Sequence, residues 1–388
     1  MCLAYMPGSY AQYQLSVYAP ELIQSFGLTT SQFSSLFTAP MIVAIFLSFV
    51  GGMISDKVGS KKVINISFVI AGIGMIGRVF ANSYMPFFLC MALTGFSNMF
   101  VNINASKITA SWFEQEKLGI LMGIFAFCGQ LPGAFATATT AVLFDSRTSA
   151  FIVSEIFCIS VFVLWLLFVK DKPEDTMEER EKIDQENQPS IGDSLKVVLS
   201  NKGIWLVSIC IMMALGSMVT LSTFMPMALQ TMYGIDLKVC GTIASMLTLG
   251  NCIGSITGPI VFSKIKNVKV FVSGAAVLSF AGIIMCWRFP SIFVLHILVL
   301  YTGIMLGASM PIFLSAPVLV EGLGTKYAGS AAGVISTLQL LGAVLIPTYI
   351  LTPIAGDNYS LLFMLASICM VIMFLCGLLL PQFGNNQK

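Results

Sequence analysis

Twelve apolar stretches fill the chain, and each has the length of a helix that crosses a bilayer. A crossing needs about 20 mainly apolar residues, and none of the stretches shows the strict alternation of a barrel strand. Backbone polar groups in lipid must be paired within helices or closed barrels, so the pattern predicts an all-α membrane protein. The expected helices cover 1–27, 31–55, 62–82, 84–111, 117–143, 149–170, 203–230, 237–263, 268–288, 290–320, 327–354 and 358–381.

One connection between these helices is long and charged. Residues 171–202 carry a run of acidic and basic side chains from Asp171 to Glu186, which is too polar for the membrane. It divides the helices into six and six. We therefore expect an N-terminal six-helix bundle over 1–170, a partly helical cytoplasmic linker over 171–202 and a C-terminal six-helix bundle over 203–388.

The few charged residues predict the orientation of the helices. The chain has 20 Lys and Arg, 18 Asp and Glu and one His among 388 residues. If both termini are cytoplasmic, fifteen basic residues fall on the inner side and four on the outer side, as the positive-inside rule requires. The outer four are Arg78, Arg147, Lys238 and Arg288, and Lys107 alone falls inside a helix. The predicted location is the inner (plasma) membrane, and the net charge of +2 gives no sign of a nucleic-acid partner.

The sequence carries no pattern typical of an enzyme or a metal site. One His cannot support a multi-histidine centre, and neither H-E-x-x-H nor the phosphate loop G-x-x-x-x-G-K-[ST] occurs. The ten cysteines lie almost wholly in apolar helices without a C-x-x-C pair. We therefore expect no catalytic residue, no metal and no cofactor.

The two halves of the chain resemble each other. Leu93–Gly95 in the fourth expected helix reads like Tyr301–Gly303 in the tenth, at an offset of 208 residues. The Lys117–Gly119 segment lines up with Tyr327–Gly329 in the same way, at an offset of 210. A six-plus-six duplication is typical of carriers that hold their substrate near the midplane between the two halves.

The loop between the second and third helices reads Gly52-Met-Ile-Ser-Asp56-Lys57-Val-Gly59-Ser-Lys-Lys. It closely resembles the loop 2–3 signature of the major facilitator superfamily, G-x-L-a-D-R-x-G-R-K, and the resemblance covers essentially the whole chain. It implies twelve transmembrane helices in two pseudo-symmetric bundles. In that family the loop joins the two halves on the cytoplasmic side, so the resemblance implies a gating role for Gly52, Asp56, Lys57 and Gly59. Ser60 departs from the signature where a basic residue is usual, which would weaken that contact.

A finer resemblance concerns the substrate. Residues Ala11–Pro20 look like the first helix of the oxalate:formate antiporter group, and Ser111–Gly119 resembles a stretch of many anion facilitators. The expected eighth and eleventh helices, however, lack the basic residues that oxalate carriers place there, and the central arginines of nitrate carriers are missing too. The resemblance therefore implies a small anion, but neither oxalate nor nitrate.

In the resembled family, helices 1, 4, 7 and 10 line the pathway, with 2, 5, 8 and 11 beside them. Polar residues in these helices are our candidates for substrate binding, although helix–helix hydrogen bonding would use the same residue types. Lys107 either binds or gates the anion, or extends its ammonium group to the cytoplasmic interface. The candidates are Tyr10, Gln12, Tyr13, Gln14, Asn98, Asn102, Lys107, Thr220, Thr248, Asn251, Ser309 and Gln339.

Proton coupling is poorly supported by the sequence. A proton-driven facilitator usually has a carboxylate or His in its pathway. Glu21 and Glu155 fall towards outer helix ends and His296 in the outer half of the tenth helix, so we interpret all three as structural. Exchange or facilitated diffusion of a small anion, or of a substrate that carries its own proton, fits better than a dedicated proton relay. The coupling partner stays open between a proton and a counter-anion.

Together these patterns predict a monomeric secondary transporter of a small polar solute, working by alternating access as an exchanger, symporter or facilitator. The favoured substrate is a small, monocarboxylate-like organic anion, and the lipid bilayer is the other partner. One alternative is export of amphipathic compounds, because 23 Met and 30 Phe can form an adaptable apolar site. Another, from a different class, is a membrane sensor without transport.

Overall fold

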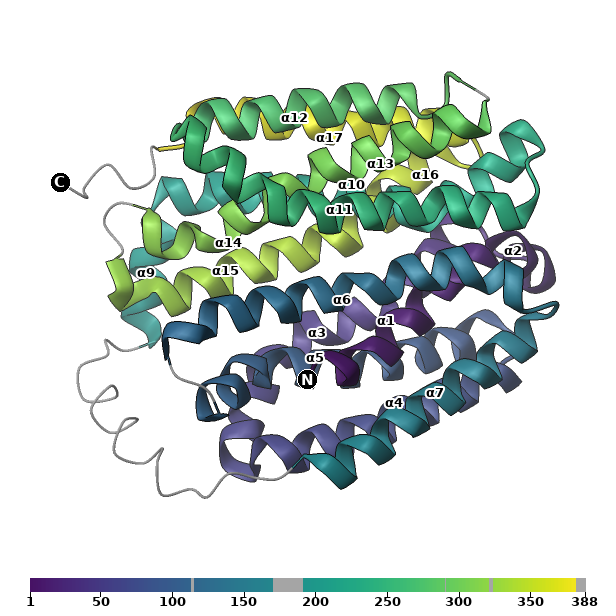
Figure 1. Cartoon of the computed structure of the whole chain (residues 1–388), viewed down its shortest axis with the longest axis horizontal. Coiled ribbons are helices and arrows are strands. Elements are labelled where there is room, and N and C mark those ends of the chain that lie inside the picture. The colour runs from purple at the N-terminus through teal and green to yellow at the C-terminus, as the bar shows by residue number, and fades with distance from the viewer. Residues whose placement is uncertain (113–114, 170–190, 290, 321–323, 382–388) are drawn as a thin grey trace. The chain divides into compact units, whose positions relative to one another are not determined.

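The computed structural model describes residues 1–112, 115–169, 191–289, 291–320 and 324–381, and every regular element in these ranges is a helix (Figure 1). The bounds are α1 Cys2–Val17, α2 Ala19–Phe26, α3 Thr30–Val58, α4 Ser60–Phe80, α5 Tyr84–Trp112, α6 Gln115–Leu143, α7 Arg147–Phe168, α9 Ile191–Ser200, α10 Lys202–Tyr233, α11 Leu237–Ile265, α12 Val268–Met285, α13 Ile292–Ala308, α14 Met310–Leu319, α15 Gly324–Leu345, the π-helix η2 Ile346–Leu351, α16 Thr352–Ala355 and α17 Tyr359–Leu379.

These helices form the twelve transmembrane segments of two pseudo-symmetric six-helix bundles, which confirms the predicted fold class. Among the described residues, ten segments are long and apolar enough to cross a membrane. The other two are the first segment, made of α1 and α2, and the fifth, which is α6. The predicted linker lies outside the described residues up to residue 190, and α9 occupies its last third.

Three of the expected helices are interrupted, and each break has a local cause. The first stops at Tyr18 because Pro20 stands in the first turn of α2, where its missing N–H costs nothing. The tenth is divided at Ser309, which is followed by Pro311 in the first turn of α14. The eleventh widens into the π-helix, whose first turn holds Pro347. Such breaks leave carbonyl groups without their usual helical partner, which membrane proteins satisfy through neighbouring helices.

Within the first bundle, α1 is enclosed by other helices. It packs against α3, α5, α6 and α7, while α4 lies against α5 and α7. Ala11, Leu15 and Val17 are completely buried, and so are the polar Gln14 and Ser16. A buried helix with this many polar side chains needs partners from the helices around it, because an unpaired polar group in an apolar environment is costly.

The same close contacts recur in both halves. A Cβ added to Gly74 of α4 would lie 2.8 Å from Leu93 Cβ and 3.1 Å from the Thr94 backbone nitrogen in α5. A Cβ added to Gly282 of α12 would lie 2.5 Å from Thr302 Oγ1 in α13. The offset of 208 residues that relates the sequence repeats therefore also relates the contacts between the third and fourth helices of each half.

A row of glycines brings α11 and α13 together in the second half. Glycine recurs at every fourth position of α11 from Gly250 to Gly258, and each one faces backbone atoms of α13. A Cβ on Gly254 would lie only 2.2 Å from the Ile304 carbonyl oxygen. Small residues at this spacing let two membrane helices approach closely, so packing and weak Cα–H···O contacts hold the pair together.

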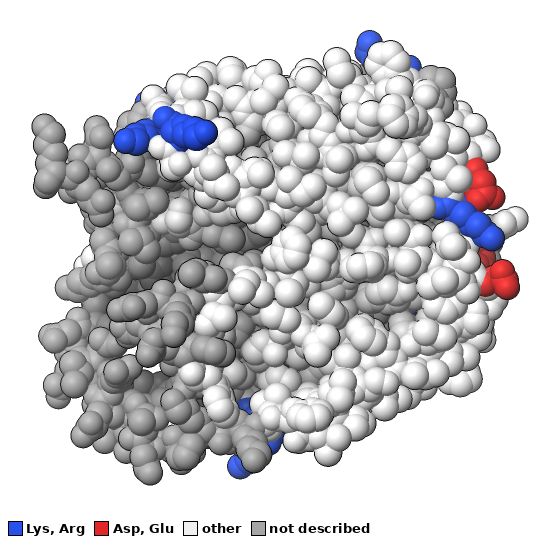
Figure 2. All heavy atoms as spheres, viewed as in Figure 1, with Lys and Arg blue, Asp and Glu red and all other residues white. Residues whose placement is uncertain are grey.

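The chain divides into two compact units. The first comprises Met1–Pro173 with Ser222–Thr248, and the second Glu174–Leu221 with Leu249–Lys388. Within the first unit, Phe33 of α3 meets Phe224 of α10 edge to face, with ring centroids 5.9 Å apart. On the face drawn in Figure 2, the charged side chains lie near its edges and the described surface between them carries none, as a membrane-embedded surface requires.

Candidate functional site

Helix α1 has a polar contact with nearly every helix around it, and this hub is the candidate functional site of the first bundle. Towards α3, the buried Gln12 donates from Nε2 to the Phe37 carbonyl oxygen over 2.8 Å. Towards α6, the Tyr10 hydroxyl lies 3.2 Å from Thr139 Oγ1. Two predicted binding residues thus have a polar group in contact with a neighbouring helix. Helix–helix hydrogen bonding of this kind was the alternative to substrate binding that the sequence left open.

Asn98 of α5 bonds to the backbone of α1 next to a proline. Pro7 lies inside α1 and has no N–H to donate. With its amide oriented to suit its neighbours, Asn98 donates from Nδ2 to the Tyr5 carbonyl oxygen (3.0 Å) and accepts at Oδ1 from the Ser9 N–H (3.1 Å). Gly8 makes this approach possible, because a Cβ there would lie within 3 Å of all three polar-end atoms of the Asn98 side chain. The structure therefore places the Asn98 amide on α1.

Two candidates of the first bundle keep part of their side chain accessible. Tyr13 is half-buried, with its ring against Gly133 of α6 and edge to face with Phe37 at 5.5 Å between centroids. Asn102 is the only exposed residue of α5 between Met91 and Ala105. An exposed amide in a helix that is otherwise enclosed over four turns is available to a ligand.

The inner face of α1 meets an arginine that we placed at an outer helix end. Arg78 does stand in the last turn of α4, but its side chain is buried, with 1% of its surface exposed. Its Nη1 donates to the Ala11 carbonyl oxygen (2.9 Å), and its Nη2 donates to Gln14 Oε1 (3.2 Å) and to Ser154 Oγ. The guanidinium group also lies over the Phe151 ring, 4.3 Å from its centroid.

Gln14 therefore serves the bundle and not an open surface. It is completely buried, and it donates from Nε2 to the Ala150 carbonyl oxygen of α7 (3.2 Å) while accepting from Arg78. Its amide thus connects α4, α1 and α7. We predicted Gln14 as a substrate ligand, and the structure places both ends of its amide on protein groups.

The arginine cluster is a property of the first half alone. At the repeat offset of 208, Arg78 corresponds to Cys286, whose Sγ lies 3.4 Å from Thr302 Oγ1. Next to it, the Trp287 ring stacks on Phe363 with centroids 4.5 Å apart. An aromatic contact thus occupies the region where the first half has a guanidinium group. Arg288 is exposed beyond the end of α12.

The predicted binding residues of the seventh, eighth, tenth and eleventh helices are mostly buried. Thr220 donates to the Gly216 carbonyl oxygen over 2.8 Å, and Asn251 donates from Nδ2 to Met218 Sδ over 3.2 Å. Thr248 is buried and Gln339 is half-buried. Ser309 is completely buried at the break between α13 and α14, and its hydroxyl has no partner.

The predicted gating loop is described in part. Gly52 is half-buried and Lys57 is exposed. Gly59 ends α3 with φ at 95°, a conformation that favours glycine, so the tight turn is present. Next to the loop, Ser55 donates to Asn104 Oδ1 of α5, and both residues are buried. The side chains of Asp56 and Lys107 lie outside the described part of the structure.

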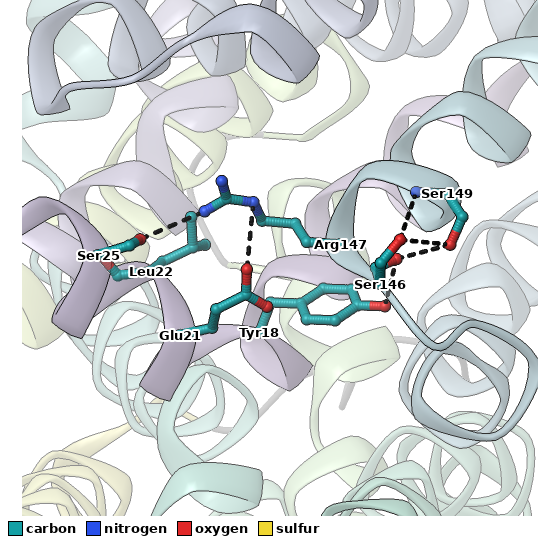
Figure 3. Close-up of polar contacts among 7 residues, drawn as sticks. All are labelled: Tyr18, Glu21, Leu22, Ser25, Ser146, Arg147 and Ser149. Atoms are coloured by element: carbon teal, nitrogen blue, oxygen red, sulfur yellow. Dashed lines mark hydrogen bonds and ion pairs between the residues drawn. The ribbon is translucent and has the colours of Figure 1, made fainter.

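A second polar cluster fixes the C-terminal end of the first segment, formed by α1 and α2 (Figure 3). Arg147 Nε lies 3.6 Å from Glu21 Oε1, and its Nη1 donates to Ser25 Oγ over 3.4 Å. The Tyr18 hydroxyl donates to the Ser146 carbonyl oxygen over 3.3 Å. These contacts join α2 to the start of α7 and explain why Glu21 and Arg147 stand at this end of the bundle.

Sequence reasoning missed Arg78 as a functional candidate. It stands two residues before the end of an apolar run, where a basic residue usually anchors a helix to the interface. A signal was present in Gln14, Ser154 and Glu155, which are polar residues inside apolar stretches. Their common partner, however, becomes visible only when α1, α4 and α7 are packed together.

Comparison with known proteins shows the family. The model of the Major Facilitator Superfamily matches residues 1–347. The chain therefore belongs to this superfamily of transporters and is not an enzyme. It is a multi-pass membrane protein, and the resemblance drawn from the loop motif is confirmed.

Several relatives resemble the chain over most of its length. A probable sulfoacetate transporter, SauU, of Cupriavidus necator is 24% identical over 87% of this chain and 82% of its own. A galacturonate transporter of Dickeya chrysanthemi is 24% identical over 69% and 81%. The membrane sensor protein UhpC of Salmonella typhimurium is 24% identical over 84% and 78%. Among solved structures, a mutant of the nucleoside transporter NupG superposes with a TM-score of 0.78 at 14% identity, covering 98% of both chains.

Proposed function

We propose that this chain is a secondary transporter of a small organic anion that carries a carboxylate or sulfonate group, and that it works by alternating access. The structural observation that carries the proposal is the exposed amide of Asn102 in the otherwise enclosed helix α5. The names of two relatives, which refer to sulfoacetate and galacturonate, support an anionic substrate. We further propose that both termini are cytoplasmic and that the chain works as a monomer.

Neutral donors and one lysine would divide the work of binding. The Asn102 amide and the Tyr13 side chain would orient the solute, because Asn102 is exposed, Tyr13 is half-buried and neither has a charge to trap the solute. Lys107 lies five residues further along α5 and supplies the positive charge. A lysine inside a membrane helix costs about 2.5–3.5 kcal/mol on insertion scales, and a bound anion would offset part of that cost.

The second half would contribute hydroxyl and amide groups from residues that also hold its helices. Ser309 is the best candidate, since its hydroxyl has no partner and stands at a helix break. Thr220, Thr248, Asn251 and Gln339 remain proposed ligands of the same kind. The loop with Gly52, Asp56, Lys57 and Gly59 remains the proposed cytoplasmic gate.

Counterflow in proteoliposomes tests the proposal. Vesicles loaded with unlabelled sulfoacetate or galacturonate should accumulate the labelled anion transiently, whereas galactose, which lacks the carboxylate, should not exchange. The Lys107→Ala variant should lose about ten- to a hundredfold in transport efficiency, as expected for a hydrogen bond to a charged group of about 1.5–3 kcal/mol. Lys202→Ala is the matched control, because Lys202 is an exposed lysine at the start of α10 and lies outside the gating loop.

Two results would contradict the proposal. Equal transport by the Lys107→Ala and Lys202→Ala variants would remove Lys107 from the site. Absence of counterflow for every carboxylate and sulfonate tested would contradict the proposal that the substrate is an organic anion. Ligand-dependent thermal stabilisation without any flux would instead favour a sensor. The similarity to a membrane sensor protein is the reason for testing this alternative. Stimulated efflux of amphipathic compounds would favour an exporter.

A further inference from the structure

The arginine cluster contains two buried atoms without a hydrogen-bond partner, and they are complementary. One is Arg78 Nε, a donor, and the other is Glu155 Oε2, an acceptor. Arg78 and Glu155 are close enough to interact electrostatically, yet no ion pair joins them in the described structure. A direct salt bridge would satisfy both atoms at once. Each residue of this pair therefore has one buried polar atom that the other could satisfy.

The hydrogen bonds of the cluster favour a protonated Glu155 in this arrangement. The acceptors around Arg78 are all neutral: the Ala11 carbonyl oxygen, Gln14 Oε1 and Ser154 Oγ. Glu155 is only 7% exposed, and its Oε2 receives no hydrogen bond. A buried carboxylate without donors is costly in a membrane helix, and adding a proton removes its charge.

Little else faces Glu155. Arg78 from α4 is the one charged group near it among the described residues, and Cys158, one turn along α7, is a neutral thiol. The residues around Arg78 are uncharged as well: Gln14 of α1 accepts a hydrogen bond from it, and Cys90 of α5 lies near it. Gly72 of α4 leaves space beside the carboxyl group, since a Cβ there would lie 3.5 Å from Oε1. The charge of Glu155 can therefore be balanced by Arg78 or removed by a proton.

We propose that Glu155 is a proton-binding site and that its proton decides which partners Arg78 holds. With the proton bound, Arg78 keeps Ala11, Gln14 and Ser154, and so fixes α1 against α4 and α7. When the O–H bond of Glu155 breaks and the proton passes to water, the carboxylate takes the Nε–H of Arg78 as an ion pair. The guanidinium group then turns away from Gln14 and α1 is released. The proposal rests on the proposed transport function, because it makes a proton the coupling ion.

The described residues of the second half contain no equivalent of this charged pair. Cys286 stands at the position equivalent to Arg78, and the Trp287–Phe363 stack fills the adjoining space. In the second half, an aromatic contact packs the third helix against its neighbour without an arginine. An arginine that served only for packing could be replaced in the same way in the first half. Retaining a charge pair at 1% and 7% exposure in a membrane protein indicates a use for the charge.

The concentration ratio of the anion that a proton gradient produces should differ between the wild-type chain and a variant without the Glu155 carboxyl group. In proteoliposomes with an inward proton gradient of one pH unit, the wild-type chain should concentrate galacturonate, a monoanion, up to about tenfold if one proton enters with each anion. Glu155→Gln should still catalyse counterflow at a rate within about twofold of wild type, but it should bring the anion only to equal concentrations. Glu21→Gln is the matched control, since that carboxylate is 51% exposed and should leave accumulation unchanged.

A readout without substrate keeps this test apart from that of the proposed function. Infrared spectra of the purified protein should show a carbonyl band of a protonated carboxylic acid that disappears as the pH rises and is missing from Glu155→Gln. If no anion moves at all, the transport proposal fails and the band still decides the role of Glu155. Spectra of wild type and Glu155→Gln that match, or gradient-driven accumulation by Glu155→Gln, would overturn the proton site.

Whether variants of Glu155 fold is a further test of the proton site. By our argument the neutral Gln resembles the protonated acid, and Glu155→Met keeps a similar volume without charge. Both should therefore fold with Arg78 still bound to Gln14 and Ser154. Failure of both to fold would mean that Arg78 needs a permanent carboxylate beside it, and the proton site would be wrong.

Discussion

Replacing Gly254 by alanine tests the helix packing of the second half most directly. The added Cβ would lie 2.2 Å from the Ile304 carbonyl oxygen, 2.9 Å from its carbonyl carbon and 3.0 Å from the Ala308 nitrogen. All three are backbone atoms, so no side chain can turn aside. Helix α11 or α13 must move as a whole.

The size of the effect follows from that geometry. Ordinary van der Waals contact begins near 3.4 Å, so the Ile304 oxygen and the new Cβ must separate by roughly 1.2 Å. Overpacking of this kind costs about 1–3 kcal/mol. It also disturbs the neighbouring glycines at 250 and 258, which depend on the same helix separation. We therefore expect a clear loss of stability, although alanine is intrinsically the better helix former by about 1 kcal/mol.

Gly274→Ala is the matched control, because a Cβ on this glycine of α12 meets no atom within 4 Å. The measurement is the midpoint of thermal unfolding of the two variants and wild type in the same detergent. Gly254→Ala should unfold at a lower temperature than wild type, and Gly274→Ala at the same or a higher one. If the two variants unfold together, the close approach of α11 and α13 is not what holds this part of the bundle.

Two further variants separate structure from transport. Asn98→Leu should lower the unfolding midpoint, because it removes the amide that bonds to Tyr5 and Ser9. The buried polar groups left unpaired cost about 1–3 kcal/mol. Asn102→Leu, at an exposed position of the same helix, should instead reduce counterflow with little change in the midpoint. The reverse pattern would exchange their roles. Glu21→Gln should lower the free energy of unfolding by less than about 1 kcal/mol, and by less still at high salt, because the Glu21–Arg147 pair is largely solvent-exposed. If its unfolding midpoint falls as far as that of Asn98→Leu, this ion pair is a principal support of the bundle.

Several features of the site were within reach of the sequence. The twelve segments and the repeat at an offset of 208 follow from local patterns, and the structure reproduces the repeat in the Gly74–Thr94 and Gly282–Thr302 contacts. The turn at Gly59 was equally readable, since a glycine between two helices suits a positive φ. Asn102 was named as a candidate ligand from its place in the fourth segment, and that role stays a prediction.

Other predictions stay untested, because the sequence could not separate two uses of the same residue types. Polar residues in a membrane helix serve either a ligand or a neighbouring helix, and spacing along one helix does not distinguish the two. Gln12 and Gln14 both looked like ligands, yet their amides bond to Phe37 and to Ala150 and Arg78. Glu155 looked structural because the sequence does not show which charges surround it.

The sequence by itself determined that this protein lies in a membrane, that it has two related bundles and that it belongs among facilitators, because hydropathy and repeats are written residue by residue along the chain. Only the tertiary structure decided that Arg78 is buried and which residues share it. Its partners come from α1 and α7, far apart in sequence, and the cost of placing a charge in lipid depends on whether such partners are within reach.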